Sequence, residues 1–393
     1  MSFESLSSDF YGYESKLSDR EKELIVELRA FLETKVRPIA NDLWSRAEFY
    51  PRDIVQGLAD LGLFGQPWEE TRRFENSAVF RGWVALELAR VDASVATIVG
   101  VQNGLVMGSI AVAGSPEQRA EWMPRLASGE LLGAFALTEP LSGSDASHGL
   151  RTTAKRDSDN WVINGAKRWI GNGSICDITI VWAKDVADGQ VKGFIVPTST
   201  PGYSATVIEN KQALRIIQNA DIVLDNVVVA ESNRLQESHS FRETAAVLRR
   251  TRAEVAWAAV GNSVGAYDAA VKYASERIQF GKEIGEHQLV QQLLAKSLGN
   301  ITASIGLVTR VSEMLDEGTQ KDEHSSLAKE YTTSRMRETV AWCRELLGGN
   351  GIVLDYGVMR HFADAEAIYS YEGTREMNTL IVGRSITGHA AFV

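Results

Sequence analysis

The sequence predicts a mixed chain in which a helical region, a β region and a second helical region follow one another. Its 393 residues suffice for two or three domains with substantial cores. Apolar residues recur at helical spacing in the first third and again from about residue 241, whereas between about 133 and 233 the repeat shortens to two and turn residues multiply. We therefore expect an N-terminal helical domain (1–132), a middle β-barrel or β-sandwich domain (133–235) and a C-terminal four-helix bundle (236–393).

The N-terminal region opens with a helix-start signal. Ser18 is followed three residues later by Glu21, the arrangement of a capping box, and apolar residues continue at helical spacing. We expect this helix to end before Pro38, because proline has no backbone N–H to donate and clashes with the preceding turn. Further helices are predicted over residues 54–63, 78–90, 96–112 and 116–126.

Alternating apolar and polar residues predict strands in the middle region. Residues 160–163 are predicted to form a strand that runs into an Asn164-Gly165 turn, a common hairpin signal. Further strands are predicted over residues 178–183, 193–197 and 222–229. In the last part of the chain, helices are predicted over residues 244–277, 287–315, 326–347 and 378–387.

The composition narrows the class of protein. With 44% hydrophobic and 23% charged residues the chain is typical of a globular protein, and its formal net charge of -10 argues against binding to a nucleic-acid backbone. No apolar run approaches the length of a membrane span, the N-terminus has no signal-like apolar stretch, and residues 391–393 form no peroxisomal signal. We therefore expect no nucleic-acid binding, no membrane insertion and a cytoplasmic location.

Metal and disulfide chemistry are not indicated by the sequence. Cys176 and Cys343 lie far apart and form no Cys-x-x-Cys pair, and the six histidines show neither i, i+4 pairing nor adjacent cysteines. We expect no metal site, and we interpret both cysteines as small buried apolar residues.

Two motifs suggest other enzyme classes. Gly261, Ser263 and Gly265 match the nucleophile elbow of hydrolases, but an elbow needs a strand before it, and residues 255–274 have a helical pattern. We therefore interpret these three as close-packing residues at a helix contact. Residues 349–351 (Gly-Asn-Gly) lack the third glycine of a dinucleotide fingerprint, so a nicotinamide-binding domain is not supported.

The main candidate for a catalytic residue is Glu372, in the tetrad Tyr371-Glu372-Gly373-Thr374. By itself such a tetrad is often an ordinary turn between helices with a solvated acid. Four upstream segments change this interpretation: 137–145 (LTEPLSGSD), 167–172 (KRWIGN), 276–281 (ERIQFG) and 347–351 (LGGNG). In this order and spacing the five segments closely resemble the acyl-CoA dehydrogenase family of flavoproteins, over nearly the whole chain from about Leu17 to Phe392.

The resemblance implies an FAD site. The loop that follows residue 138 would lie along the flavin ring and the pyrophosphate, although a serine-rich β-turn has the same composition. Arg277 would bind the FAD pyrophosphate of the neighbouring subunit, or else it merely complements a helix end. Residues matched to the flavin half are Phe135, Leu137, Thr138, Gly143, Ser144, Trp169, Ile170 and Gly171. The other matched cofactor contacts are Gln279, Phe280, His287, Gln288, Glu345, Leu346, Gly348, Gly349, Thr374 and Glu376.

For catalysis, the resemblance implies that Glu372 is the general base that takes the α-proton of an acyl-CoA thioester while the β-hydrogen leaves as hydride to the flavin. It also implies a homotetramer built as a dimer of dimers, with electron-transfer flavoprotein as the acceptor. Residues assigned to substrate contacts are Ala96, Ser144, Arg249, Arg252, Tyr371 and Gly373.

Details of the sequence leave the acceptor and the substrate open. Gly171 stands where the family usually has a small hydroxyl residue, and residues 168–172 are similar to short-chain acyl-CoA oxidases, so oxygen is an alternative acceptor. Residues 379–388 are similar to glutaryl-CoA dehydrogenase, but the arginine that pairs the distal carboxylate there falls on Ala96 here. We therefore expect a short or branched uncharged acyl chain. The alternative substrates are glutaryl-CoA and a thioester on a carrier protein. The alternative to an enzyme is a non-catalytic flavin-binding scaffold.

Overall fold

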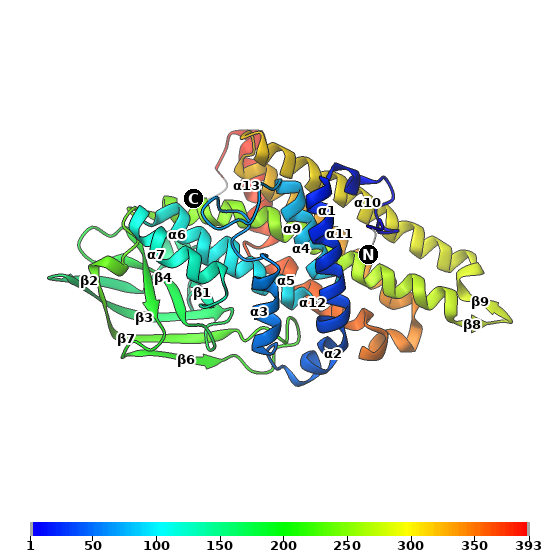
Figure 1. Ribbon diagram of the computed structural model, residues 1–393, viewed down its shortest axis with the longest axis horizontal. Helices are drawn as coiled ribbons and strands as arrows, with labels where there is room; N and C mark the ends of the chain where they lie inside the picture. Colours follow the sequence, from blue (N-terminus) through cyan, green and yellow to red (C-terminus); the bar gives the residue numbers. More distant parts are fainter. Residues whose placement is uncertain (1–2, 391–393) are drawn as a thin grey trace.

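A computed structural model describes residues 3–390, so the C-terminal tripeptide 391–393 discussed above lies outside the described residues. Helices at the start and end of the chain flank a β region, and this order confirms the predicted fold class. The β region lies at one end of the molecule, and a short hairpin (β8 Ile278–Gln279, β9 Lys282–Glu283) lies at the opposite end (Figure 1).

The first helix begins as predicted but does not end before Pro38. In α1 (Asp19–Phe31) the Ser18 side chain accepts from the Glu21 backbone, and the Glu21 carboxylate accepts from the Ser18 N–H at 2.8 Å. The chain then passes through a π-helical turn (η2, Leu32–Val36) directly into α2 (Arg37–Arg46), so the predicted break is wrong. The π turn shifts the hydrogen bonding to i, i+5, and Pro38 thereby falls in the first turn of α2, where its missing N–H costs little.

The remaining N-terminal helices follow the predicted ranges closely. They are α3 (Arg52–Asp60), α4 (Ala78–Val91), α5 (Ala93–Gly100), the π segment η3 (Val101–Met107), α6 (Gly108–Ala113) and α7 (Pro116–Ala127). The continuous stretch Ala93–Ala113 is long and apolar enough to cross a membrane, which corrects the statement that no run reaches that length. Most of this stretch is buried inside the protein, as expected for a core helix.

One seven-stranded sheet forms the middle region. Its strands are β1 (Gly133–Ala136), β2 (Thr153–Asp157), β3 (Asn160–Ile170), β4 (Ile178–Asp185), β5 (Val191–Pro197), β6 (Tyr203–Val207) and β7 (Ala220–Ala230). They lie in the order β1-β4-β2-β3-β7-β6, with β5 paired to β4. The predicted turn at Asn164-Gly165 is wrong, because β3 continues through it with a register shift between Ile163 and Gly165. A side chain at residue 165 would collide with the Thr152 backbone, so this glycine serves a close approach within the sheet.

The C-terminal part contains the four predicted long segments and one helix more. These are α9 (Phe241–Glu276), α10 (Gln288–Asp316), α11 (Asp322–Leu346) and α13 (Arg375–Thr387), with the additional α12 (Val358–Ser370) before the last. Two short 3-10 helices, η6 (Gly348–Ile352) and η7 (Leu354–Tyr356), separate α11 from α12. The start of α12 was therefore not predicted from the sequence.

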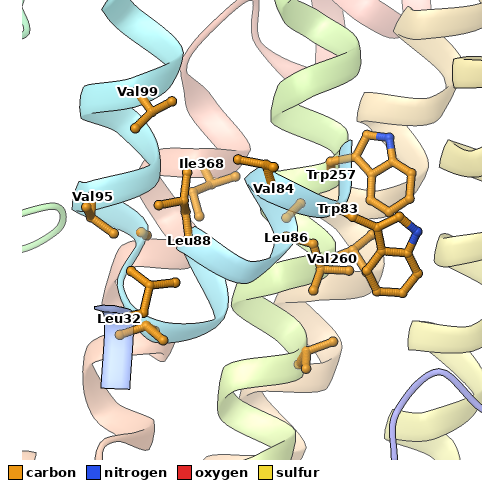
Figure 2. Packing of buried hydrophobic residues seen from close by; sticks show 14 of the residues in the cluster. Leu32, Trp83, Val84, Leu86, Leu88, Val95, Val99, Trp257, Val260 and Ile368 are labelled. Atoms are coloured by element: carbon orange, nitrogen blue, oxygen red, sulfur yellow. The ribbon is translucent and has the colours of Figure 1, made fainter. Parts of the chain in front are cut away.

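Close packing of α9 against α4 forms the centre of the core. A Cβ at Gly261 would lie 2.2 Å from the Leu86 carbonyl, and one at Gly265 would lie 2.3 Å from the Arg90 carbonyl. Trp83 and Trp257 pack beside this contact with ring centroids 5.6 Å apart (Figure 2). The elbow-like motif is therefore part of a helix contact, which confirms the interpretation from the sequence.

A buried ion pair fixes the segment that follows β1. The Lys167 ammonium is fully buried and donates to Glu139 Oε1 at 2.9 Å and to the carbonyls of Leu137 at 3.0 Å and Trp182 at 2.7 Å. Glu139 also accepts from the backbone N–H groups of Arg151 and Thr152. Burial lowers the pKa of Lys167 to about 8. These contacts hold residues 137–139, the start of the first motif, against β3.

Because this pair is buried, we expect Lys167→Met to destabilise the protein by about 3 to 5 kcal/mol, since Glu139 would remain as an uncompensated charge. The measurement is the free energy of unfolding from urea titration. The exposed Lys155→Met on β2 is the control and should change it by less than about 0.5 kcal/mol. Adding Glu139→Gln to Lys167→Met should recover part of the loss. A loss below about 1 kcal/mol in Lys167→Met would contradict a structural role for the pair.

Candidate active site

Glu372 lies in the turn between α12 and α13, in an unusual backbone conformation. Its φ is 55° and that of Gly373 is 84°, both in the left-handed region. A residue with a bulky side chain rarely adopts this conformation, and where it does the surrounding structure must hold it. A left-handed glutamate in a turn between two helices is therefore a candidate for function.

Three residues hold this turn in place. Lys329 on α11 donates from Nζ to the Gly373 carbonyl at 2.5 Å, and the buried Asn378 on α13 donates to the same carbonyl at 2.9 Å. The Thr374 side chain caps α13 by accepting from the Met377 N–H. The predicted cofactor contact Thr374 thus has a structural role as a helix cap, and Lys329 and Asn378 are site residues that the sequence did not reveal.

The Glu372 carboxylate sits among groups that act on its protonation in opposite directions. Burial raises its pKa above the ordinary range, whereas a hydrogen bond from Thr251 and the charges of Lys329 and Arg252 lower the pKa. The Thr251 hydroxyl on α9 lies 2.8 Å from Glu372 Oε2. A carboxylate with a raised pKa that nearby donors keep ionisable is suited to proton abstraction.

Tyr371 and Glu372 lie close to helix α5. Both side chains are largely surrounded by protein and keep partial solvent exposure. Tyr371 lies near Thr97 of α5, the neighbour of Ala96, and a Cβ at Gly100 on the same helix would meet nothing within 4 Å. The predicted residues Ala96, Tyr371, Glu372 and Gly373 therefore belong to one region, between α5 and the turn before α13.

Residues predicted to contact the flavin ring lie where the segment after β1 meets the end of β3. The Arg168 N–H donates to the Thr138 carbonyl at 2.9 Å, which joins the segment after β1 to the end of β3. Trp169 is left-handed, with φ 64°, and its side chain is 51% exposed. Phe135 is half-buried, but the Ile170 side chain is buried in the core of the β domain, which leaves only its backbone for a cofactor.

The space around two predicted cofactor contacts, Gly143 and Gly349, is open. A Cβ at Gly143 or at Gly349 would meet nothing within 4 Å, and neither has a positive φ. Contacts within the chain therefore do not require glycine at either place, which suits close approach by an external group such as FAD. Ser144 is exposed beside Gly143. Gly348 differs, because its φ of 59° requires glycine for backbone reasons alone.

The other predicted cofactor residues lie at the far end of α9. Arg277 follows α9, Phe280 forms the tip of the β8–β9 hairpin with 95% exposure, and Asn350 bonds to Tyr273 at 2.9 Å. From Thr251 to Arg277 the helix rises roughly 39 Å at 1.5 Å per residue. One FAD molecule at Glu372 does not span that distance, so this group is not part of the same site within one chain. It comprises Arg277, Gln279, Phe280, His287, Gln288, Glu345, Leu346, Gly348 and Gly349.

Of the remaining predicted residues, Glu376 and Arg249 lie at the surface, whereas Arg252 lies near the Glu372 turn. Glu376 is exposed and pairs with Arg375 at 2.8 Å, and Arg249 is exposed at the start of α9. Arg252 forms an ion pair with Asp322, but its buried Nε has no partner in residues 3–390 and lies near the Glu372 turn. That free donor faces the site rather than the surface.

Comparison with known proteins identifies the family. Models of the acyl-CoA dehydrogenase N-terminal, middle and C-terminal domains match residues 18–130, 134–227 and 241–387, respectively. The chain belongs to the acyl-CoA dehydrogenase family. Members of this family are FAD-dependent oxidoreductases that act on CH–CH bonds, so the expected cofactor and enzyme class are confirmed.

Individual acyl-CoA dehydrogenases match nearly the whole chain. An acyl-CoA dehydrogenase from Bacillus subtilis is 32% identical over 92% of this chain and 96% of its own. A glutaryl-CoA dehydrogenase from Mycobacterium smegmatis superposes with a TM-score of 0.94 at 35% identity, covering 99% and 100% of the two chains. A structure of a glutaryl-CoA dehydrogenase from the same organism with FADH2 gives 0.92 at 32% identity, covering 98% of each chain. A chain in the electron transferring flavoprotein structure of Acidaminococcus fermentans gives 0.90 at 27%, covering 95% and 99%.

The hydrogen bond from Thr251 stabilises the ionised form of Glu372, so Thr251→Val should raise the pKa of Glu372 further. A carboxylate must be ionised to take a proton, so under the hypothesis that Glu372 is the general base the acidic limb of flavin reduction against pH should move to higher pH. Stopped-flow reduction between pH 5 and 9 provides the measurement. Thr251→Ser keeps the hydroxyl and should follow the parent profile. Coincident profiles for Thr251→Val and the parent would show that the bond does not act on the base.

Proposed function

We propose that this acyl-CoA dehydrogenase introduces a double bond between Cα and Cβ of a short or branched uncharged acyl-CoA, with Glu372 as the general base. The observation that carries the proposal is the Glu372 carboxylate itself. It is held in a left-handed turn, largely surrounded by protein, hydrogen-bonded to Thr251 and close to the cations Lys329 and Arg252.

Each step on the protein side uses a group already described. Glu372 takes the α-proton, and the Glu372 backbone N–H, which donates to no other residue in the described part of the chain, is free to bond the thioester carbonyl. Such a donor stabilises the negative charge that develops on that oxygen. When bound, FAD supplies the two-electron acceptor for the hydride that leaves Cβ. Because Glu372 keeps partial solvent exposure, the bound substrate would complete the exclusion of water from the proton that Glu372 removes.

We further propose that two subunits build each cofactor site. Phe135, Thr138, Gly143, Ser144 and Trp169 would contact the flavin half in one chain. The group around Arg277 lies roughly 39 Å away along α9, so a second copy of the chain would supply it. Its exposed aromatic tip and guanidinium suit a site completed by association. A homotetramer built as a dimer of dimers satisfies this requirement in all four subunits.

An uncharged acyl chain is favoured by the residue at position 96. Ala96 ends at its Cβ, and its neighbours Val95 and Thr97 are uncharged, so this part of α5 has no cation for a distal carboxylate. Burying that carboxylate without a partner would cost several kcal/mol. Glutaryl-CoA stays the second candidate because two M. smegmatis relatives carry that name. Arg252, with its free Nε, and Arg249 are the proposed contacts for the thioester and CoA.

Electron-transfer flavoprotein is the proposed acceptor, and oxygen is the alternative. The first is supported by the similar chain in the A. fermentans electron transferring flavoprotein structure. The second is suggested by Gly171, which lacks the hydroxyl side chain usual in the family. A cytoplasmic location suits either acceptor. A non-catalytic scaffold is disfavoured, because such a protein has no use for a strained, enclosed glutamate.

Glu372→Gln tests the base directly. The variant should keep its fold and its FAD but lose flavin reduction by roughly a hundredfold to ten-thousandfold, the usual contribution of a positioned general base. The measurement is anaerobic bleaching of the flavin by butyryl-, isobutyryl- and glutaryl-CoA. Glu366→Gln, at an exposed carboxylate on α12, is the matched control. Parent-like bleaching in Glu372→Gln would place the base elsewhere, and faster bleaching by glutaryl-CoA would overturn the uncharged assignment.

Gly171→Thr tests the acceptor. The φ of Gly171 is not positive, and a Cβ there meets nothing closer than 3.7 Å, so threonine fits the backbone. We expect the variant to form less hydrogen peroxide in air while anaerobic flavin reduction is spared, because the side chain narrows the approach of oxygen. Gly299→Thr, at an open position on α10, controls for threonine in general. An unchanged peroxide rate would exclude a role for Gly171, and parent turnover in air as fast as with an artificial dye would indicate an oxidase.

A further inference from the structure

A second carboxylate, Glu254, lies on the face of α9 from which Thr251 contacts Glu372. Glu254 follows Thr251 by three residues on α9, so the two side chains lie on one face of the helix. Like Glu372, it is deeply enclosed by protein but keeps partial exposure. Within residues 3–390 its carboxylate forms no hydrogen bond and no ion pair.

The fold leaves room for this carboxylate. A Cβ at Gly104, in the π segment η3, would lie 3.1 Å from Glu254 Oε2 and 2.7 Å from Thr251 Cγ2. Any larger residue at position 104 would push against both side chains. Gly104 thus allows Glu254 to extend over η3 beside Thr251, the residue that contacts the base.

The charges around Glu254 do not supply a hydrogen-bond donor. Arg81 on α4 lowers its pKa and Glu372 raises it, and burial, the largest effect, brings the pKa to about 7. The Arg81 guanidinium is itself engaged by Asn76, at 2.8 Å from its side-chain oxygen, and lies 3.7 Å from Asp316. Arg81 therefore contributes a favourable field, whereas the Glu254 carboxyl has no direct partner among residues 3–390.

We propose that Glu254 determines substrate specificity by hydrogen-bonding a hydroxyl group on the acyl chain, which makes a hydroxyacyl thioester the preferred substrate. The proposal rests on the proposed function and refines its uncharged substrate class. A hydrocarbon chain bound beside Glu254 would displace water from its carboxyl without forming a hydrogen bond in return. This loss would make the binding free energy less favourable. The hydroxyl must lie at C4 or beyond, since C2 and C3 lose the two hydrogens.

A hydroxyl also suits Glu254 better than a charged substituent does. It donates to the ionised carboxylate and accepts from the protonated one, so it pairs in either state near neutral pH. An ammonium pairs only with the ionised form, and a substrate carboxylate only with the protonated form.

The test compares chains of equal size. The two pairs are 4-hydroxybutyryl-CoA with pentanoyl-CoA, and 5-hydroxypentanoyl-CoA with hexanoyl-CoA. In at least one pair we expect the parent to prefer the hydroxyacyl thioester by at least about tenfold in kcat/KM. This ratio corresponds to one hydrogen bond to a charged group. Glu254→Leu should abolish or reverse that preference, and Glu254→Gln, which still donates and accepts, should keep part of it. Glu121→Leu, an exposed carboxylate on α7, should leave the ratio at the parent value.

Binding without turnover gives a second readout that needs no variant. Calorimetric titration of the parent with non-reactive thioether analogues of each pair should show the same preference. Equal affinity within both pairs, or an equal kcat/KM ratio in parent and Glu254→Leu, would overturn the inference. Stronger turnover of 4-aminobutyryl- or glutaryl-CoA would also overturn it. Absence of flavin bleaching with every acyl-CoA would instead overturn the proposed function, and the thioether titration would then still decide the role of Glu254.

Discussion

The close contact between α4 and α9 is the constraint on which the rest of the structure depends. At Gly261 and Gly265 the two backbones approach so closely that no side chain fits between them. This contact sets the position of α9 relative to α4, and α9 carries Thr251, Arg252 and Glu254 toward the candidate site. A substitution that separated the helices would therefore move the partners of Glu372 as well as open the core.

Local signals in the sequence were sufficient for most of the fold. The capping box at Ser18, the change of apolar repeat near residue 133 and the helical context of Ser263 each act within a few residues, and each prediction was confirmed. The errors have a common cause. At Pro38 a π turn places the proline in the first turn of α2, and at Gly165 the strand continues because Thr152 approaches closely, so the local pattern of proline or Asn-Gly gave the wrong outcome.

The candidate site was predictable only in part, for the same reason. Glu372 stands in a recognisable motif, but Thr251 contacts it across 121 residues and Lys329 approaches its turn from α11. A threonine or a lysine within a long helix carries no signal of such a contact. Glu254 was equally hidden, because an acid in a helix normally faces water. Only the three-dimensional arrangement shows that Thr251 and Glu254 lie on the face of α9 that contacts Glu372.

The two enclosed carboxylates differ in what surrounds them, and this difference separates their roles. Glu372 has a hydrogen-bond donor, Thr251, and two nearby cations that favour its charged form, so it can act as a base once substrate excludes water. Among the described residues Glu254 has the field of Arg81 but no hydrogen-bond donor, and burial raises its pKa to about 7. Two acids in one site with different surroundings can serve two functions. We infer that Glu372, which has a hydrogen-bond donor and nearby cations, takes the proton. Glu254 would receive its hydrogen bond from the substrate.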